Sequence, residues 1–230
     1  MDDRPLRIAV PKGSLYPESV ELLGMAGLDV SGLADPGRQL RISAGDVEYI
    51  IVRPSDAPIF VAYGGADCGL CGKDSVQEAG LPVVEMVDLG FGACRFVVAE
   101  PECSCYSAQE SYRNLGVLRV ATKYPNITKD YYDSKGMQVE IVKLAGNIEL
   151  APLIGMADVI VDITATGTTL RENHLEIVDD VMESTARFVA NPASLRVDPR
   201  VGELAESLAA AALKRGRSAP IAGSDQPGIK

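Results

Sequence analysis

The chain has 230 residues, and its 22 basic and 32 acidic side chains give a formal net charge of −10 at pH 7. This length suits one large domain or two small ones, and the 47% hydrophobic share is typical of a globular protein. The acidic balance argues against a nucleic-acid partner, and no apolar run reaches the roughly 20 residues of a membrane span. The polar, acidic start is unlike a secretory signal, so we expect a cytoplasmic protein with no membrane partner.

Apolar, β-branched runs alternate with amphipathic segments along the chain. This alternation predicts βα units, that is, an α/β fold with mainly parallel sheets. Several runs are almost entirely apolar, which is typical of strands that helices cover on both faces. In chain order the segments are 6–10, 19–27, 47–52, 56–64, 66–72, 83–89, 94–99, 117–122, 139–144, a helix at 149–157, then 158–163 and a helix at 198–216.

Two segments resemble each other: CRFVVAEPE at 94–102 and ARFVANPAS at 186–194 are both apolar runs that end in a turn with proline. Such a pair can carry the chain into a second lobe and back again. The end of the chain has no periodicity and many helix breakers, so we expect it to be disordered. The predicted division is lobe one at 1–92 plus 190–215, lobe two at 93–189 and a tail at 216–230.

The cysteines and the histidine do not predict a metal site. The five cysteines are Cys68, Cys71, Cys94, Cys103 and Cys105. The first two lie in an apolar, glycine-punctuated segment that suits burial, and the last two are separated by one residue, a spacing shorter than structural zinc sites use. We therefore predict no structural zinc. The single histidine, His174, lies in a polar stretch and builds neither a histidine-based metal site nor a hydrolase triad.

The segment DVIVDITATGTTL at 158–170 carries the strongest chemical signal. A buried strand delivers Asp162, and a loop rich in hydroxyls follows it. Hydroxyls and backbone N–H groups suit a phosphate, glycine allows close approach, and an acid at a strand end accepts hydrogen bonds from ribose. No Walker lysine follows, so the pattern indicates a ribose phosphate rather than a triphosphate. The loop residues are Thr164, Ala165, Thr166, Gly167, Thr168 and Thr169.

Charged residues also follow other predicted strands. Because ligands bind at the carboxyl ends of strands in α/β sheets, their repeated position suggests one cleft for a small anionic substrate. These residues are Lys12 and Gly13, Arg53, Lys73 and Asp74, and Glu149 at the start of a predicted helix.

Five segments of the chain carry a family resemblance, in this order: PKGSL, RPSDAP, ADCGLCGKD, RVATKYPNIT and NIELAPLIGMADVIVDITATGTTL. With these segments the chain resembles the ATP phosphoribosyltransferase of histidine biosynthesis. The similarity extends to about residue 195, and the length resembles the catalytic subunit of the family's short form. The resemblance implies two periplasmic-binding-protein-like lobes around a central cleft. It implies transfer of the phosphoribosyl group of phosphoribosyl pyrophosphate (PRPP) to N1 of the adenine of ATP, with release of pyrophosphate. It also implies Mg²⁺ bound mainly through substrate phosphates, a homodimer, and a separate regulatory subunit similar to a histidyl-tRNA synthetase.

The resemblance also implies roles for individual residues. The 162–169 segment would hold the ribose and 5-phosphate of PRPP, and Glu149 would position substrate. Arg53 and Lys12 would act in catalysis on the phosphates, with Lys73, Asp74, Gly13 and Arg38 in the substrate site. The family often has arginine where this chain has Ser14, so we expect basic residues elsewhere to supply the phosphate contacts.

Two other interpretations remain open at this point. A Rossmann-like phosphoribosyltransferase acting on another base shares the acid–loop signature, but it predicts a single-lobed sheet. A non-catalytic, two-lobed protein that binds small anions would share the lobes, but proteins of that kind are normally exported.

Overall fold

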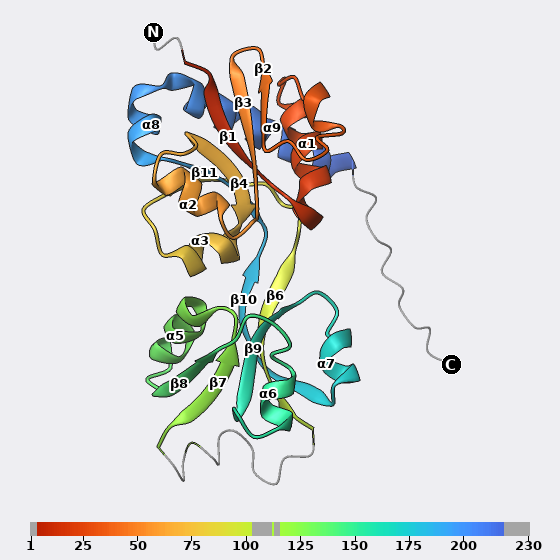
Figure 1. Cartoon of the computed structure of the whole chain (residues 1–230), viewed down its shortest axis with the longest axis vertical. Helices are drawn as coiled ribbons and strands as arrows, with labels where there is room; N and C mark the ends of the chain where they lie inside the picture. Colours follow the sequence, from red (N-terminus) through yellow and green to blue (C-terminus); the bar gives the residue numbers. More distant parts are fainter. Residues whose placement is uncertain (1–3, 103–111, 113–115, 219–230) are drawn as a thin grey trace, which may run out of the picture.

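The computed structural model describes residues 4–102, 112 and 116–218, which form two lobes stacked along the long axis of the molecule (Figure 1). A six-stranded sheet in the order β2-β3-β1-β4-β11-β5 builds the first lobe, and a five-stranded sheet in the order β10-β6-β9-β7-β8 builds the second. The two sheets confirm the predicted two-lobed α/β architecture and contradict the single sheet of the Rossmann-like alternative.

The first lobe contains β1 (Leu6–Pro11), η1 (Gly13–Leu15), α1 (Tyr16–Met25), η2 (Ser31–Leu33), β2 (Arg41–Ala44), β3 (Val47–Val52), α2 (Ala57–Ala62), β4 (Cys68–Gly72), α3 (Lys73–Ala79), β5 (Val84–Asp88), β11 (Ala186–Ala190), α8 (Pro192–Val197) and α9 (Pro199–Ser218). The second lobe contains β6 (Cys94–Pro101), β7 (Leu118–Thr122), α5 (Pro125–Ser134), β8 (Val139–Lys143), α6 (Leu150–Leu153), β9 (Val159–Thr164), α7 (Thr168–Glu172) and β10 (Leu175–Ser184).

The first sheet has three parallel strands at its centre, and the second has three parallel strands on one side and two antiparallel strands on the other. In the first sheet β1 runs parallel to β3 and β4, and in the second β7 runs parallel to β8 and β9. The antiparallel strands include β6 and β11, which follow the two crossings between the lobes. Both sheets are therefore mixed, and each contains the parallel strands that the sequence predicted.

The register places the carboxyl ends of β4 and β9 at the junction between the lobes. Ala186, the first residue of β11, pairs with Gly72 at the end of β4. Ser184, the last residue of β10, pairs with Cys94 at the start of β6, and the next residue of β6 pairs with Thr164 at the end of β9. Only one residue separates β10 from β11, so these two sheet edges face each other.

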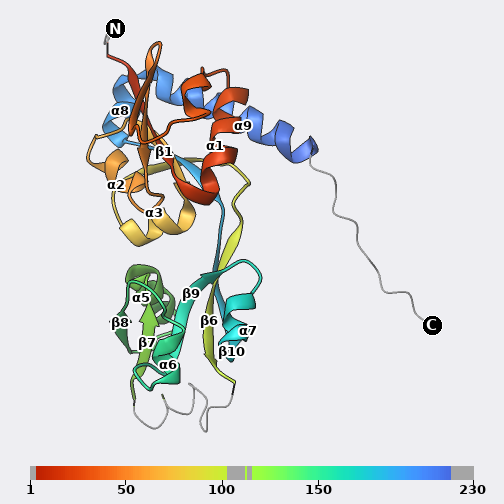
Figure 2. The same ribbon diagram turned by 45° about the vertical axis from the view of Figure 1, so that its right-hand side comes forward.

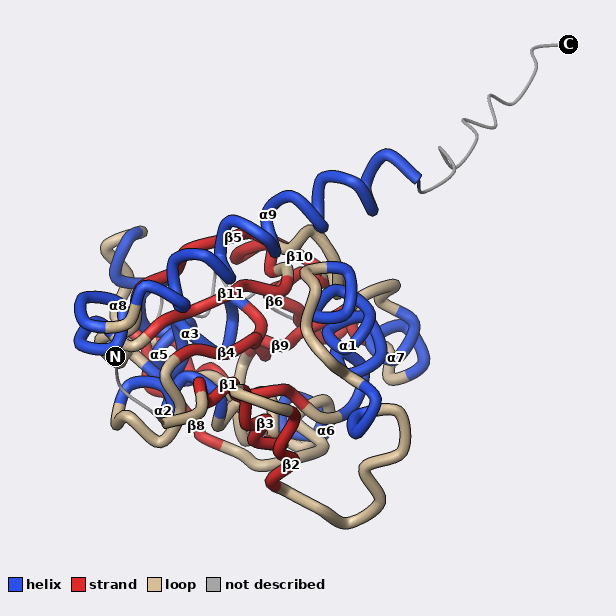
Figure 3. Tube along the Cα trace, turned by 90° about the horizontal axis from the view of Figure 1, so that it is seen from above, coloured by secondary structure: helices blue, strands red, loops and turns tan. Residues whose placement is uncertain are grey.

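Helices cover both faces of the first sheet, which explains its apolar strands. One face packs against α1 and α9, with Leu22 and Leu208 fully buried, and the other packs against α2 through Val61. Helix α9 buries Val201, Leu204, Ala205 and Leu208 at helical spacing. It crosses the first lobe and extends past it (Figures 2 and 3). None of the helices in the part of the chain described is long and apolar enough for a membrane span.

The structure differs from the sequence prediction in several elements. The helix expected at 149–157 is only α6, because Gly155 takes φ +74°, a left-handed conformation that ends helices. Strand β11 belongs to the first sheet, although most of it falls in the range 93–189 predicted for lobe two, and the strand that returns from the second lobe is β10. Helix α9 continues to Ser218, into the predicted tail, whose remaining residues 219–230 lie outside the described residues.

A buried carboxylate holds the far end of the first lobe together. Asp67, whose side chain is 1% exposed, accepts hydrogen bonds from the backbone and guanidinium of Arg7 and from the hydroxyl of Ser194, and it pairs with Arg4 at 3.1 Å. It thereby joins β1, the start of β4 and α8. Burial alone raises the pKa of Asp67, but the hydrogen bonds from Arg7 and Ser194 outweigh it and hold the pKa below its ordinary value.

We expect Asp67→Asn to lower the free energy of unfolding at pH 7 by about 3 kcal/mol, because it leaves buried donors without their charged partner. Since the folded-state pKa is lowered, this contribution is present above the pKa of the unfolded chain, near 4, and is lost as the pH falls through the folded value. Urea unfolding at several pH values measures it. Asp133→Asn, which removes an exposed helix pair with Lys129, is the control and should change stability by less than about 0.5 kcal/mol. Equal effects of the two changes would contradict the assignment.

Candidate functional site

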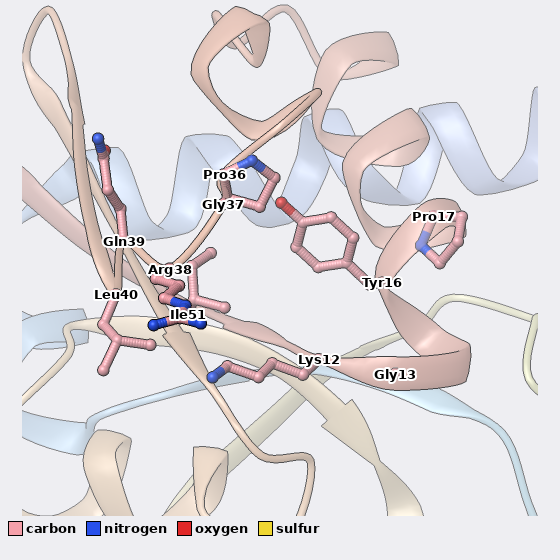
Figure 4. A pocket seen from close by; sticks show the side chains of 10 residues that line it. All are labelled: Lys12, Gly13, Tyr16, Pro17, Pro36, Gly37, Arg38, Gln39, Leu40 and Ile51. Carbon is pink, nitrogen blue, oxygen red and sulfur yellow. The ribbon is translucent and has the colours of Figure 1, made fainter.

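The end of β1 opens onto a cavity of about 440 Å³ in the first lobe. Lys12, which follows β1, and Gly13, the first residue of η1, line it together with Arg38 from the loop before β2. The side chains of Lys12 and Arg38 point into the cavity (Figure 4). Gly13 has φ +77°, a conformation that favours glycine and turns the chain sharply after the strand. The structure thus brings together three of the residues predicted from the sequence.

A second cavity, of about 490 Å³, lies between the lobes. Arg53, which follows β3, and Asp74 in the first turn of α3 line it from the first lobe, and Tyr124 after β7 lines it from the second. Neither Arg53 nor the two cations of the first cavity form an ion pair within the described residues. Positive groups without carboxylate partners are available to an anionic ligand.

Lys73 and Asp74 begin α3 at the junction of the lobes. The backbone N–H of Lys73 donates to Thr185, and the carboxylate of Asp74 accepts a 2.7 Å hydrogen bond from the hydroxyl of Ser184 at the end of β10. Lys73 lines neither of the two cavities. Burial raises the pKa of Asp88, but hydrogen bonds from Thr185 and Gly90 and the positive charge of Arg187 hold the pKa below its ordinary value. The charge of Lys73 adds a smaller lowering effect.

The second lobe presents a buried acid at the end of its sheet. Asp162 in β9 is 7% exposed, and one of its carboxylate oxygens is buried with no hydrogen-bond partner in the described part of the chain. The ammonium of Lys123 lies 4.0 Å from the other oxygen. Burial raises the pKa of Asp162, Lys123 opposes that rise, and the negative charge of Glu149 adds to it. Lys123 and Glu149 thus both act electrostatically on Asp162.

The loop after β9 presents hydroxyls on its exposed side. Thr166 and Thr168 form a 2.9 Å hydroxyl–hydroxyl hydrogen bond, and the guanidinium of Arg171 donates to the carbonyl of Thr166 and the hydroxyl of Thr168. Gly167 is buried at φ +71° and donates its N–H to the hydroxyl of Thr164. Ala165 and Thr169 complete the exposed part of the loop.

Three residues at these edges were missed in the sequence analysis. Lys123 and Tyr124 follow a predicted strand, the signal used for the other candidates, and the buried hydroxyl of Thr122 fixes them by accepting from Tyr124 N–H. Arg171 follows the predicted loop directly. Its role depends on α7, a five-residue helix that no sequence periodicity indicates.

The described cysteines are not arranged as a zinc site. Cys68 packs in the core under α1 and α9, whereas Cys71 packs in the core under α2, on the opposite face of the sheet. Two side chains on opposite faces cannot bind one ion. Burial raises the pKa of both thiols. Cys103 and Cys105 lie outside the described residues.

We expect Asp162→Asn to stabilise the chain. A raised folded-state pKa means that the ionised carboxylate opposes folding, so the stability that protonated Asp162 contributes is lost as the pH rises through the folded value. The neutral amide avoids that loss, and the melting temperature at pH 7 should rise by about 2–4 °C, the effect of roughly 1 kcal/mol in a chain of this size. Differential scanning calorimetry at pH 7 and pH 4 measures it, and the difference should shrink at pH 4. A lowered melting temperature at pH 7 would show that Asp162 is structural.

Comparison with known proteins identifies the family. The family model HisG, described as ATP phosphoribosyltransferase, matches residues 53–210. The ATP phosphoribosyltransferase of Rubrobacter xylanophilus is 48% identical over 194 residues, which cover 84% of this chain and 90% of that protein. The family-model match includes the strand and loop at 158–170, one of the segments on which the resemblance rested.

Solved structures agree with the sequence matches. A chain of the ATP phosphoribosyl transferase (HisG:HisZ) complex from Thermotoga maritima superposes with a TM-score of 0.76 at 33% identity, over 91% of this chain and 99% of that one. A histidine kinase sensor domain with similarity to periplasmic binding proteins superposes with a TM-score of 0.54 at 14% identity, over 94% of both chains, and shows the fold alone. The chain therefore has two periplasmic-binding-protein-like lobes, belongs to the HisG family of ATP phosphoribosyltransferases and is an enzyme of the first step of histidine biosynthesis.

Proposed function

We propose that PRPP binds to the second lobe, with its ribose against Asp162 and its 5-phosphate in the loop at 164–169. The observation that carries this proposal is the buried Asp162 oxygen without a hydrogen-bond partner. An unpaired buried acceptor is costly, and a ribose hydroxyl donates the missing hydrogen bond. Lys123 keeps a positive charge beside the carboxylate and supports its ionised, accepting form.

The loop has the chemistry of a phosphate site. The hydroxyls of Thr166 and Thr168 and the guanidinium of Arg171 already contact one another, so they present several donors within a small volume. A charge-assisted hydrogen bond from a guanidinium to phosphate is about twice as strong as a neutral one. Gly167 keeps the backbone free of a side chain at the bend, which allows the phosphate to approach closely.

The cations of the first lobe face the leaving group and the ATP phosphates in this proposal. Arg53 and Lys12 neutralise the charge that grows as pyrophosphate leaves. Arg38, Gly13 and Asp74 complete the substrate site from the two cavities, and Lys73 does so from the start of α3, outside them. Glu149 positions the ribose beside Asp162. Adenine N1 carries no proton at neutral pH, so the reaction needs orientation and charge stabilisation rather than a strong base.

A magnesium ion fits this arrangement as a ligand of the substrates. The described residues contain no group of three His, Cys, Asp or Glu side chains that could hold a metal ion. Asp162 and Glu149 offer the oxygen chemistry that Mg²⁺ prefers, and Mg²⁺ usually binds through one or two carboxylates plus substrate phosphates. When bound, it neutralises charge on the pyrophosphate oxygens.

We also propose that the chain forms a homodimer and assembles with a regulatory subunit similar to a histidyl-tRNA synthetase. The related Thermotoga maritima chain comes from a HisG:HisZ complex, which supports a hetero-oligomer. Histidine inhibition requires a second site that biases the catalytic one. In this proposal the partner supplies that site.

Arg53→Ala should reduce turnover, measured as pyrophosphate release from ATP and PRPP, by about ten- to a hundredfold, because one charge-assisted contact to phosphate contributes roughly 1.5–3 kcal/mol. Arg53 is exposed and forms no ion pair with any residue that the structure describes, so the melting temperature should not change. Lys129→Ala, which removes an exposed cation of α5, serves as the control and should leave turnover intact. A folded Arg53 variant with full turnover would remove this residue from the site.

The partner proposal predicts weak histidine inhibition of the isolated chain and strong inhibition after the regulatory subunit is added. The measurement is pyrophosphate release across a histidine titration, with the mass of each sample from light scattering. The isolated chain should have the mass of a dimer. Potent, non-competitive inhibition without a partner would overturn the two-subunit proposal.

A further inference from the structure

Helix α3 contacts the second lobe with two acidic side chains four residues apart. Asp74 accepts from the hydroxyl of Ser184 at the end of β10, and Glu78 accepts from backbone N–H groups at the start of α5. Residues four apart lie on one face of a helix, about 6 Å from each other along its axis. Figures 1 and 2 show α3 and α5 facing each other across the junction.

Glu78 satisfies backbone donors that α5 leaves open. Pro125 begins the helix and has no N–H, and the next two N–H groups, of Asn126 and Ile127, each donate to a Glu78 carboxylate oxygen at 3.1 Å. The positive end of the helix dipole favours a carboxylate at this position. The side-chain amide of Asn126 returns a 2.7 Å hydrogen bond to the backbone carbonyl of Glu78.

These contacts restrict the motion of the lobes. The crossing strands and the Asp74–Ser184 bond lie together at the junction, and a contact at one place still allows rotation about it. The Glu78 contact lies one helical turn further along α3, so the two contacts together fix the angle between the lobes. Glu78 and Asp74 also line the interlobe cavity with Arg53 and Tyr124, so the same contact sets the width of that cavity.

We propose that Glu78 is a positioning residue that holds the lobes closed, so that the cations of the first lobe face the PRPP loop of the second before both substrates are bound. This inference rests on the proposed placement of the substrates. If substrates bind only to the closed form, the apparent dissociation constant is the intrinsic one divided by the fraction of molecules that are closed. A contact that raises this fraction therefore makes substrate binding tighter. Burial between the lobes raises the pKa of Glu78, against the lowering by the two N–H groups and Lys143, which agrees with a carboxylate withdrawn from water.

The first test is independent of catalysis. Small-angle scattering of the full chain without substrates, coupled to size-exclusion chromatography, compares the wild type with Glu78→Ala and with Gln77→Ala, an exposed neighbour on α3. The Glu78 variant should have a larger radius of gyration at an unchanged assembly mass, and the Gln77 variant should match the wild type. Identical radii for all three proteins would overturn the proposal.

The second test separates positioning from folding. Glu78→Ala should raise KM for both substrates by about tenfold with kcat within about twofold, because the bound substrates still close the lobes. Glu78→Gln keeps an oxygen acceptor without the charge, so its KM should lie between those of the wild type and Glu78→Ala, about threefold above the wild type. A melting temperature that drops while KM stays constant would make Glu78 merely structural and would contradict the inference.

Asn126→Ala provides the matched change on the other lobe, since it removes the returning hydrogen bond. If Glu78 and Asn126 act through the same contact, the double variant should raise KM by less than the product of the two single-variant effects. Additive effects would argue against a joint contact. Should the wild type fail to release pyrophosphate from ATP and PRPP, the proposed function fails, and the scattering comparison still decides the role of Glu78.

Discussion

The chain passes between the lobes along neighbouring antiparallel strands, and this crossing determines which sheet edges face each other. Cys94 at the start of β6 pairs with Ser184 at the end of β10, so the chain enters and leaves the second lobe at the same place. Because β6 runs antiparallel to β9, the end of β9 is held at that place, and β11 holds the end of β4 there from the other side. The residues that follow the parallel strands consequently meet across one junction.

Several carboxylates at this junction already have hydrogen-bond or ion-pair partners, so they do not neutralise the basic side chains of the site. In the first lobe the carboxylates beside the edge are occupied: Asp74 accepts from Ser184, and Asp88 accepts from Thr185 and pairs with Arg187. Arg53 lines the interlobe cavity and Lys12 lines the cavity of the first lobe, and neither forms an ion pair within the described residues of a chain whose net charge is −10. In the second lobe Asp162 is buried beside Lys123 at the cost of a raised pKa. Buried polar groups that lack partners are typical of binding sites, because the ligand completes them.

The sequence predicted the structure correctly where the pattern that specifies it lies within a short segment. The strand with Asp162 and the Thr-rich bend around Gly167 occur within a dozen residues, and both form as predicted. Strand β10 was not predicted, because its register shifts twice against β6 and its apolar residues do not alternate regularly. The contact of Glu78 with α5 joins residues 48 and 49 positions apart, and no local pattern carries that information. Lys123 was the missed residue that could have been found, since it follows a predicted strand as Lys12 and Arg53 do.

The division of the site between two lobes suits a reaction whose transition state has oxocarbenium character. Water competes with adenine N1 for the anomeric carbon, so charge stabilisation should be complete only when both lobes surround the substrates. Arg53, Lys12 and Arg38 lie on the first lobe, and the groups proposed to hold the ribose and 5-phosphate lie on the second, so neither lobe alone assembles the site. Electrostatic interactions also strengthen as water leaves the junction, since the local dielectric falls. The angle between the lobes therefore affects both the competing reaction with water and the stabilisation of charge. Helix α3 lies at the junction where we propose that this angle is set, and it contacts the second lobe through Asp74 and Glu78.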